Sequence, residues 1–347
     1  MLKKIELQNF RSHKNISFEL SNLTLIVGPN GVGKTNILEA ISLASTTRSW
    51  RTKSDIEVIS YNKNFAKIQA DDVVVVVHNN PYKKEYAVSG VRRIAKEVVG
   101  TIKTVLFEPE DLLLVLGSPA VRRHFLNVVL SQSDRNYSDS LVKYRQVVMQ
   151  RNKLLKRIRD KQSKEDELNF WDKELAILAN QIWLTRSAFI SLAQRELPKH
   201  YVCLSQDNTK ITIKHETHPA ETERLEEEQA ALREREIMFG QTIRGPHRDD
   251  FIISFNNVPA RSCASRGEVR SLVFGLKMVE LDFLSKAARE DDNDVVLLLD
   301  DVMSELDHNR RERLVEVTSS VQTVLTTTDL DHVPKVWRQK AKIIELK

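Results

Sequence analysis

Apolar and polar residues alternate along much of residues 1–90. Ile5 and Leu7 lie two positions apart, and similar short alternating runs continue up to a glycine-rich turn that begins at Gly28. Residues 65–88 repeat the pattern and include a wholly β-branched run, Val73–Val77. Alternation with a period of two is typical of strands that bury one face. We therefore expect a strand-rich N-terminal part built around the glycine-rich turn.

The middle of the chain follows a different pattern. Residues 122–197 contain no glycine, are densely charged, and carry apolar residues at helical intervals. A second charged helix, mostly acidic, is expected at 221–236. The strand pattern returns at 251–255, after Gly245-Pro246, and is followed by a helix at 265–288 and a buried strand at 295–299.

These patterns predict an α/β fold divided by a helical insertion. Residues 1–121 and 241–347 are expected to form the two halves of one α/β lobe. Residues 122–240 are expected to form a helical arm between them. Within the arm, residues 151–164 carry many cations and a single acidic residue, Asp160, which predicts the tip of a helix or helical hairpin with a positive surface.

Composition and charge narrow the possible partners. The chain has 347 residues with 53 Lys and Arg against 48 Asp and Glu, a net charge of +5 that favours a polyanionic partner. Cys203 and Cys263 lie far apart and outside any metal-ligand spacing, which is typical of a reducing compartment and predicts the cytoplasm. No uninterrupted apolar run approaches the roughly 20 residues of a membrane helix, and the N-terminus lacks a signal-peptide core.

The glycine-rich turn has the complete Walker A spacing. A predicted strand precedes it and a predicted helix, opening at Asn36, follows it, as in P-loop nucleotide sites. Backbone N–H groups and the helix N-terminus would face ATP phosphates, the Lys34 ammonium would reach the β- and γ-phosphates, and the Thr35 hydroxyl would coordinate Mg²⁺. The residues predicted to bind ATP here are the eight of the motif and the next one: Gly28, Pro29, Asn30, Gly31, Val32, Gly33, Lys34, Thr35 and Asn36.

A second carboxylate for the metal is expected at the end of the apolar strand 295–299. Asp300 follows this strand directly and is the predicted Mg²⁺ anchor, and Asp301 is placed to orient or activate the attacking water. The catalytic set is therefore Lys34, Asp300 and Asp301. Almost the whole chain separates the two motifs, whereas kinases and small GTPases place the second carboxylate much closer to the P-loop.

Three further stretches carry a family resemblance. They are residues 109–127, beginning Pro-Glu-Asp-Leu, residues 245–250, which read Gly-Pro-His-Arg-Asp-Asp, and residues 298–314. Together with the two Walker motifs they resemble the ATPase heads of the ABC and SMC type, and among these the RecF family of bacterial DNA replication and repair. The resemblance spans the whole chain. It implies an ABC-type head with lobe I assembled from both chain ends and the helical arm as lobe II.

The resemblance also implies site residues. ATP held by one subunit would be covered by the signature segment of a second subunit, with Ser265 and Gly267 in that segment, and Ser304 and Asp307 would form the D-loop. Arg11 would fold over the phosphates. Glu268 departs from the glutamine usual in the family, and its negative charge is expected to weaken ATP-driven dimerisation unless Arg266 or Arg270 pairs with it.

Four further assignments concern residues near these motifs. Glu110 could make a Q-loop-like contact to Mg²⁺ or water, or cap a helix, and Arg51 could lie near the adenine. His247 and Arg248 could couple nucleotide state to the arm or brace strands. Thr326 to Asp329 stand where transporter ATPases have a switch histidine, so hydrolysis is expected to be slow.

DNA contact is expected through phosphates and not through bases. No zinc-finger, helix-turn-helix or aromatic RNA-binding segment is present, and aromatic residues make up only 6% of the chain. Such binding is independent of sequence and weakens steeply with salt. The candidate contacts are Arg92, Arg93 and Lys96 in the β-rich part, and Arg151, Lys153, Lys156 and Arg157 in the arm.

By resemblance, ATP would close a homodimer on duplex beside a single-stranded gap, and slow, weak, DNA-stimulated hydrolysis would release it. The implied role is to help RecA load on gapped DNA together with RecO and RecR. Two alternatives stay open. One is an ABC-type ATPase subunit of another assembly, such as a transporter, and the other is a binding module that holds ATP as structural glue with little hydrolysis.

Overall fold

The computed structural model describes the chain except residues 206–208, 217–221, 289–294, 306–307 and 319. The side chains of residues 222–224, 226, 304–305, 308–309, 313 and 317 are likewise not described. The described residues form two compact units. The first comprises residues 1–112, 199–208 and 270–347, and the second comprises residues 113–198 and 209–269.

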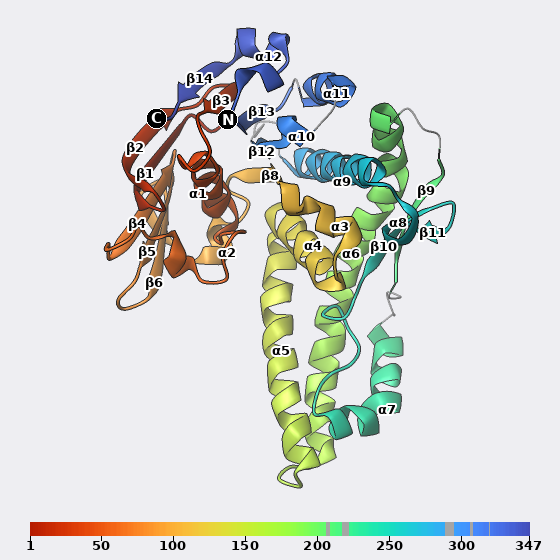
Figure 1. The fold of residues 1–347 in the computed structure, drawn as a ribbon. Coiled ribbons are helices and arrows are strands. Elements are labelled where there is room, and N and C mark those ends of the chain that lie inside the picture. The colour runs from red at the N-terminus through yellow and green to blue at the C-terminus, as the bar shows by residue number, and fades with distance from the viewer. Residues whose placement is uncertain (206–208, 217–221, 289–294, 306–307, 319) are drawn as a thin grey trace. The chain divides into compact units, whose positions relative to one another are not determined.

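Five parallel strands form one sheet of the first unit, in the order β14-β3-β13-β12-β8 (Figure 1). The residues of β12 are buried up to Leu299 and those of β13 throughout, as is usual for parallel strands covered on both faces. Their carboxyl ends lie at the same edge, so the loops after β3, β8 and β12 are neighbours there. The strands are β3 (Leu23–Val27), β8 (Lys103–Phe107), β12 (Val295–Asp300), β13 (Gln322–Thr327) and β14 (Lys342–Glu345).

A second, antiparallel sheet of the first unit has the order β2-β1-β4-β5-β6-β7. Burial alternates along β4 and β5, so one face of this sheet lies against the core, as the sequence pattern predicts. The strands are β1 (Lys4–Phe10), β2 (His13–Glu19), β4 (Phe65–Ala70), β5 (Val73–His78), β6 (Lys83–Val88) and β7 (Val91–Arg93).

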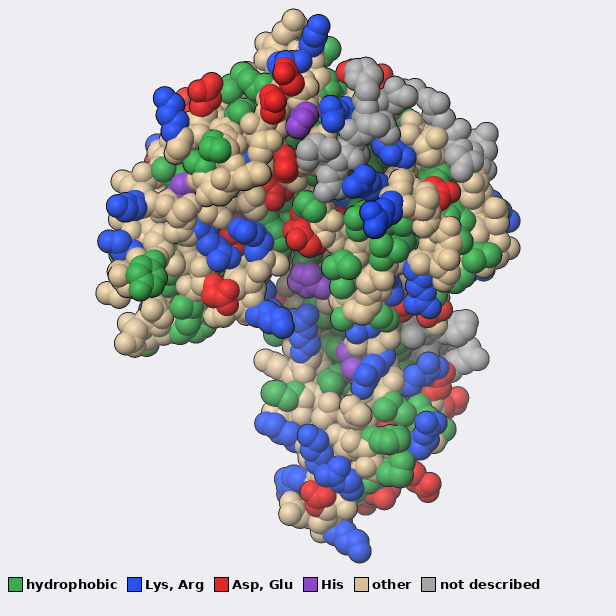
Figure 2. Space-filling model, viewed as in Figure 1, with side chains coloured by type: hydrophobic (Ala, Val, Ile, Leu, Met, Phe, Trp, Pro, Cys, Tyr) green, Lys and Arg blue, Asp and Glu red, His purple; other side chains and the backbone are tan. Residues whose placement is uncertain are grey.

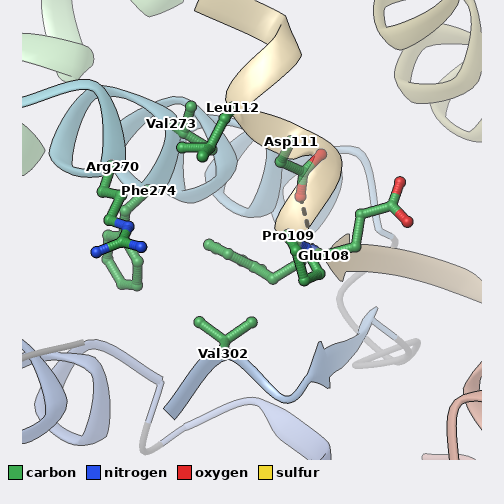
Figure 3. A pocket seen from close by; sticks show the side chains of 9 residues that line it. Glu108, Pro109, Asp111, Leu112, Arg270, Val273, Phe274 and Val302 are labelled. Carbon is green, nitrogen blue, oxygen red and sulfur yellow. Dashed lines mark hydrogen bonds between the residues drawn. The ribbon is translucent and has the colours of Figure 1, made fainter. Parts of the chain in front are cut away.

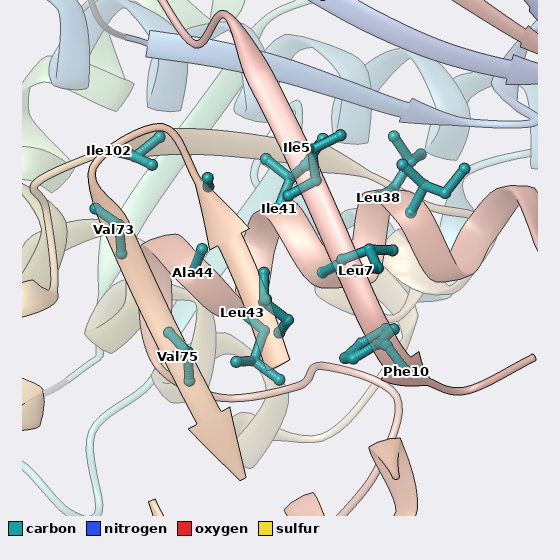
Figure 4. Close-up of a cluster of buried hydrophobic side chains, with 14 of the residues drawn as sticks. Ile5, Leu7, Phe10, Leu38, Ile41, Leu43, Ala44, Val73, Val75 and Ile102 are labelled. Carbon is teal, nitrogen blue, oxygen red and sulfur yellow. The ribbon is translucent and has the colours of Figure 1, made fainter. Parts of the chain in front are cut away.

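Helix α1 (Lys34–Thr46) contacts both sheets and is buried along most of its length. Its Ile41 and Leu43 share a hydrophobic core with Ile5 and Val75 of the antiparallel sheet and with Leu298 of the parallel sheet (Figure 4). Burial of this core fixes where α1 begins, and with it the end of the glycine-rich loop. The other helices wholly within the first unit are η1 (Asp55–Val58), α2 (Ala95–Val98), η2 (Pro109–Leu112), α10 (Val302–Glu305), α11 (His308–Thr318), η4 (Leu330–His332) and α12 (Lys335–Lys340).

The second unit is mainly helical. An antiparallel hairpin of α5 (Arg135–Arg159) and α6 (Leu168–Ser205) dominates it, and a small cluster that includes Leu155 and Leu168 closes its tip. Of the two forms predicted for residues 151–164, the tip of a helix or of a helical hairpin, the structure has the hairpin, and its cations other than Arg151, among them Lys153, Lys156 and Arg157, are exposed. α6 and α9 (Arg266–Ala287) contribute residues to both units. The remaining elements are α3 (Leu113–Leu116), α4 (Pro119–Ser133), η3 (Glu165–Glu167), α7 (Thr222–Phe239), α8 (Ala260–Cys263) and a sheet of β11 (Val258–Pro259), β10 (Phe251–Phe255) and β9 (Ile211–His215).

The structure divides the chain elsewhere than at the predicted boundaries, 121/122 and 240/241. Residues 241–269 belong to the helical unit because β10 pairs with β9 and not with the α/β sheets. Two buried ion pairs add to this, since Asp249 accepts from Arg186 at 2.8 Å and Asp250 from Arg122 at 2.6 Å. The motif 245–250 therefore braces the helical unit.

One segment, residues 165–205, has the length and apolar character of a membrane-crossing helix. Within its most apolar window, 56% is buried inside the structure. Core helices of soluble proteins have the same properties, so this feature is only a weak indication of a membrane span.

Candidate nucleotide-binding site

The loop between β3 and α1 has a conformation that its glycines make possible. Gly31 and Gly33 have φ angles of 83° and 102°, in the left-handed region. A Cβ on Gly33 would lie 2.5 Å from the Ser12 hydroxyl oxygen, and one on Gly28 would lie 2.6 Å from a backbone carbonyl of the C-terminal segment. The loop leads directly into the N-terminus of α1, which favours bound anions. The predicted phosphate loop thus has the geometry of an anion cradle.

Lys34 is buried beneath this loop. Its ammonium donates to the carbonyl oxygens of Gly28 at 2.7 Å and Pro29 at 2.9 Å, while Pro29 and Asn30 themselves are exposed. Burial lowers the pKa of Lys34, and the negative charges of Asp301 and Asp300 oppose that shift. The ammonium is therefore held by carbonyl oxygens of the loop itself.

Thr35 and Asp300 meet although 265 positions separate them in sequence. The Thr35 hydroxyl donates to the Asp300 carboxylate at 2.8 Å, and the Thr326 hydroxyl of β13 donates to the same oxygen at 2.8 Å. Burial raises the pKa of Asp300, and the two hydroxyl donors oppose that shift. This contact places a hydroxyl and a carboxylate of the two Walker motifs together.

The donor set fits Mg²⁺. Among the described residues no group of three or more His, Cys, Asp or Glu side chains could hold a metal ion. The Thr35 hydroxyl and the Asp300 carboxylate offer two hard oxygen ligands beside the loop. Mg²⁺ in phosphate sites is usually held by one or two protein oxygens, with waters and phosphates completing its shell.

Asp301 follows β12 in a left-handed conformation, with φ 51°. Its N–H donates to the Thr326 hydroxyl at 3.0 Å. This contact with β13 holds the backbone at Asp301 in place. The predicted D-loop residues, Ser304 and Asp307, follow shortly after Asp301 in the sequence. Ser304 lies in α10, while Asp307 lies outside the described residues.

Glu108 is a residue of this edge that the sequence analysis missed. It directly follows β8, whose Phe107 pairs with Leu299 of β12, so Glu108 and Asp300, the last residue of β12, lie at the ends of neighbouring strands. Burial, and then the nearby carboxylates of Asp111 and Glu110, raise the pKa of Glu108 to about 8. The signal was available, because Glu108 is the first polar residue after a strand. Glu110, for which the sequence analysis leaves a contact to Mg²⁺ or water and a helix cap both open, is exposed in η2.

A cavity lies beside Glu108 in the first unit (Figure 3). Next to it, Lys277 of α9 is buried, 2.8 Å from Glu280 and 3.8 Å from Asp111, with its ammonium over the Phe107 ring. Burial raises the pKa of Glu280 to about 7. The cavity wall combines apolar and charged side chains: Phe107, Glu108, Pro109, Asp111, Leu112, Arg270, Val273, Phe274 and Val302.

Arg11 and Arg51 are held at the first turns of α1 by one carboxylate. Glu39 is fully buried and accepts from Arg11 at 2.6 Å and 3.0 Å and from Arg51 at 3.3 Å. The Ser49 hydroxyl donates to it as well. Asn36 accepts from Arg51 at 2.9 Å and donates to the Ser12 hydroxyl. Two guanidinium groups are thus fixed near the phosphate loop, and one of them is the predicted Arg11.

The predicted signature segment opens α9. The Glu268 carboxylate accepts from the Ser265 N–H at 2.6 Å, and the Ser265 hydroxyl accepts from the Glu268 N–H at 3.3 Å. This reciprocal arrangement is a capping box. Glu268 thus caps its own helix, and Gly267 lies within the first turn of that helix.

The predicted DNA contacts divide into exposed and buried residues. Lys153, Lys156 and Arg157 are exposed on α5. Arg151 is fully buried and pairs with Asp172 at 2.7 Å and Glu236 at 2.6 Å, so its prediction as a DNA contact is wrong. It lies on the face of α5 that packs against α6 and α7. In the first unit, exposed positions are occupied by Arg92, Arg93 and Lys96.

Comparison with known proteins places these features in a family. A family model described as an AAA domain matches residues 4–324. The chain is 34% identical to the DNA replication and repair protein RecF of Moorella thermoacetica, over 99% of this chain and 94% of that protein. It is 35% identical to RecF of Streptococcus uberis, over 96% of this chain and 94% of that protein. The chain belongs to the RecF family.

Solved structures agree with this assignment. A structure described as the recombination mediator protein RecF-ATPrS in the RecFOR pathway has a TM-score of 0.87 and 31% identity, covering 96% of this chain and 94% of that chain. A head domain of Smc bound to the C-terminal winged-helix domain of ScpA has a TM-score of 0.55 at 17% identity and shares the fold alone. The RecF-family fold is therefore an ABC-type ATPase head, as the sequence predicts.

Proposed function

We propose that this RecF-family chain is a weak, DNA-stimulated ATPase that uses ATP to hold DNA. The contact between Thr35 and Asp300 at 2.8 Å carries this proposal, because it joins the two Walker motifs at one sheet edge beside the phosphate loop. Lys34 would neutralise phosphate charge as ATP binds. Mg²⁺, held by Thr35 and Asp300, would supply electrostatic stabilisation of the phosphates. Asp301 would orient or activate the attacking water.

We further propose that ATP closes a homodimer. The N-terminus of α9, with Ser265 and Gly267, would cover the ATP held by the other subunit, and Ser304 and Asp307 would line the same interface. An interface ligand of this kind stabilises the dimer by mass action. Hydrolysis would remove the γ-phosphate contact and release the dimer.

The substrate of the closed dimer would be duplex or gapped DNA, bound without sequence preference, in the cytoplasm. Solved RecF structures are described as a recombination mediator of the RecFOR pathway, which supports a role in helping RecA load with RecO and RecR. The exposed basic residues of both units support binding through phosphates.

Fluorescence anisotropy of gapped, duplex and single-stranded oligonucleotides tests this proposal. Each is titrated with ATP, ADP or no nucleotide at two salt concentrations. Tighter binding to duplex-containing DNA with ATP than with ADP is the expected result, and Lys34→Ala should remove the difference. Equal affinities in all nucleotide states would overturn ATP-dependent DNA holding. Unchanged ATP affinity of Lys34→Ala would overturn the assignment of the phosphate site.

The capping box favours a second candidate, a binding module in which ATP acts as glue with little hydrolysis. Glu268 places a carboxylate at the helix N-terminus that would face a phosphate across the dimer. Glu268→Gln keeps the capping box and removes the charge. We expect it to tighten the ATP-bound dimer about two- to fivefold, because two like charges about 4–8 Å apart in water repel each other by roughly 0.5–1 kcal/mol. Steady-state ATPase with and without DNA distinguishes the candidates, since the module shows no stimulation by DNA.

A further inference from the structure

One outward-facing row of α5 carries only cations and amides. Lys143, Gln146, Gln150, Lys153 and Arg157 follow one another at steps of three and four residues, and all five are exposed. Such spacing places side chains on one face of a helix. We call these five residues the outer stripe of α5. Because it lies within one helix of the second unit, its geometry is set by α5 alone.

The opposite face of α5 is the core face. Tyr144, Leu154 and Leu155 are buried there, as is Arg151 with its two carboxylate partners. Burial therefore separates the cations of this helix into one structural arginine and an exposed set. Only the exposed set is available to a partner.

The charge of the outer stripe has a single sign. From Ser140 to Arg159 the sequence contains seven Lys and Arg residues and no Asp or Glu. Figure 2 shows Lys and Arg side chains along this side of the arm. Cations in a surface helix are commonly balanced by acidic residues three or four positions away. Asp139, four positions before Lys143, is the one acidic residue of α5, so Lys153 and Arg157 have no such acidic neighbour within the helix.

The length of the outer stripe suits a duplex. Lys143 and Arg157 are 14 positions apart, which is about 21 Å at the helical rise, or about six base-pair steps. Glutamine amides and basic side chains both donate to phosphate oxygens. Val142 and Met149 beside the stripe are also exposed. Two apolar side chains do not make the broad apolar face that an interfacial membrane helix requires.

We propose that the outer stripe of α5 contacts the sugar-phosphate backbone of duplex DNA and contributes more to DNA affinity than the exposed cations Arg92, Arg93 and Lys96 of the first unit. This inference rests on the proposed function, because it assigns a surface to the DNA that the closed dimer holds. It predicts contact without base recognition.

The test compares two triple substitutions that remove the same charge. Lys143→Gln, Lys153→Gln and Arg157→Gln neutralise the outer stripe, and Arg92→Gln, Arg93→Gln and Lys96→Gln neutralise the exposed patch of the first unit. Glutamine is a good helix former, so α5 is retained, and circular dichroism with thermal unfolding checks folding. Anisotropy of a 30-base-pair duplex is measured with ATP across a salt series, beside binding to phosphatidylserine vesicles.

The stripe variant is expected to bind duplex DNA about tenfold or more weakly. The slope of the logarithm of its binding constant against the logarithm of salt concentration should become shallower by up to about 2.7, or 0.9 for each lost phosphate contact. In the matched patch variant, DNA affinity and its salt dependence are expected to change much less. Three outcomes would each overturn the assignment. They are equal losses of DNA affinity in the two variants, wild-type DNA affinity in the stripe variant, and a loss in the stripe variant that is confined to vesicle binding. A further outcome separates the two proposals. If the wild type bound DNA equally with ATP and ADP, and the stripe variant did not bind it, ATP-dependent holding would be overturned and the stripe would still be the DNA contact.

Discussion

At the scale of single residues, Glu39 determines where two guanidinium groups lie. Arg11 and Arg51 both donate to this fully buried carboxylate at the first turns of α1. Hydrogen bonds to a charged group contribute about 1.5–3 kcal/mol each. We expect Glu39→Gln to weaken ATP binding about tenfold by freeing Arg11, and to lower the free energy of unfolding by about 2–4 kcal/mol. Fluorescent-nucleotide titration and urea unfolding measure the two effects.

Glu57→Gln is the matched control, since it removes the same charge from an exposed residue that binds Arg11 only through its backbone carbonyl. It should leave both quantities near the wild-type values. If folded Glu39→Gln bound ATP as tightly as wild type, Glu39 would have no positioning role toward the nucleotide.

Glu108 makes stability depend on pH. Its pKa is raised to about 8 by burial and neighbouring carboxylates, against 4.5 for a free glutamate. Between these values the folded state keeps a proton that the unfolded state has lost. The stabilising contribution is therefore complete below about pH 4.5 and is lost as pH rises toward 8, at up to about 1.4 kcal/mol per pH unit.

Glu108→Gln removes this dependence. Urea unfolding at pH 5.5, 6.5, 7.5 and 8.5 should show a shallower decline for the variant than for wild type. Some decline remains, because Glu280, with a pKa of about 7, acts in the same direction. Parallel curves for the two proteins would show that Glu108 titrates normally in the folded state.

At the scale of elements, local sequence pattern predicted most of what the structure contains. β3, the glycine-rich loop and α1 follow one another as expected, because alternation, glycines and a helix start are all local signals. The same holds for β12 with Asp300 at its end. These elements carry the Walker motifs, so most of the predicted nucleotide site could be located from the amino-acid sequence alone.

What the sequence did not predict depends on contacts between distant elements. β10 alternates like a strand, but its partner is β9 of the helical unit, and pairing partners leave no trace in local pattern. Arg151 stands in a basic run, but its helical phase turns it toward Asp172 and Glu236, which lie 21 and 85 positions away. Glu108 and Glu110 both follow one strand, and only the burial of that edge distinguishes them.

The end of β12 also carries a catalytic prediction. Asp301 is set in its left-handed conformation one residue beyond Asp300, the proposed Mg²⁺ ligand, so the two aspartates should have separable roles. Asp301→Asn is expected to bind ATP within about threefold of wild type and to hydrolyse it about 100-fold more slowly, the usual scale for loss of a general base. Its dimer should live longer. Single-turnover hydrolysis and size-exclusion chromatography with ATP measure these properties.

Asp300→Asn is the comparison variant, and its defect should lie in magnesium-dependent ATP binding because it removes the carboxylate beside Thr35. A turnover rate of Asp301→Asn equal to that of wild type would remove Asp301 from the catalytic set.

At the scale of the whole molecule, the proposed function ties two ligands to one protein. ATP would bind at the sheet edge of the first unit, and duplex DNA at the outer stripe of α5 in the second. α6 and α9 contribute residues to both units, so the polypeptide links the two units at several points. In a clamp, ATP and DNA both bind the closed dimer more tightly than the open form. Binding of either ligand therefore raises the affinity for the other.

This relation is reciprocal. If ATP strengthens duplex binding by some factor, saturating duplex must strengthen ATP binding by the same factor, and couplings between sites are typically about 5–150-fold. We expect both titrations of Asp301→Asn, which should retain bound ATP, to give one value within that range. Lys34→Ala should show no coupling, since it lacks the contact to the phosphates. An ATP affinity that is identical with and without duplex would mean that DNA does not select the ATP-bound state, and the chain would then hold its two ligands independently.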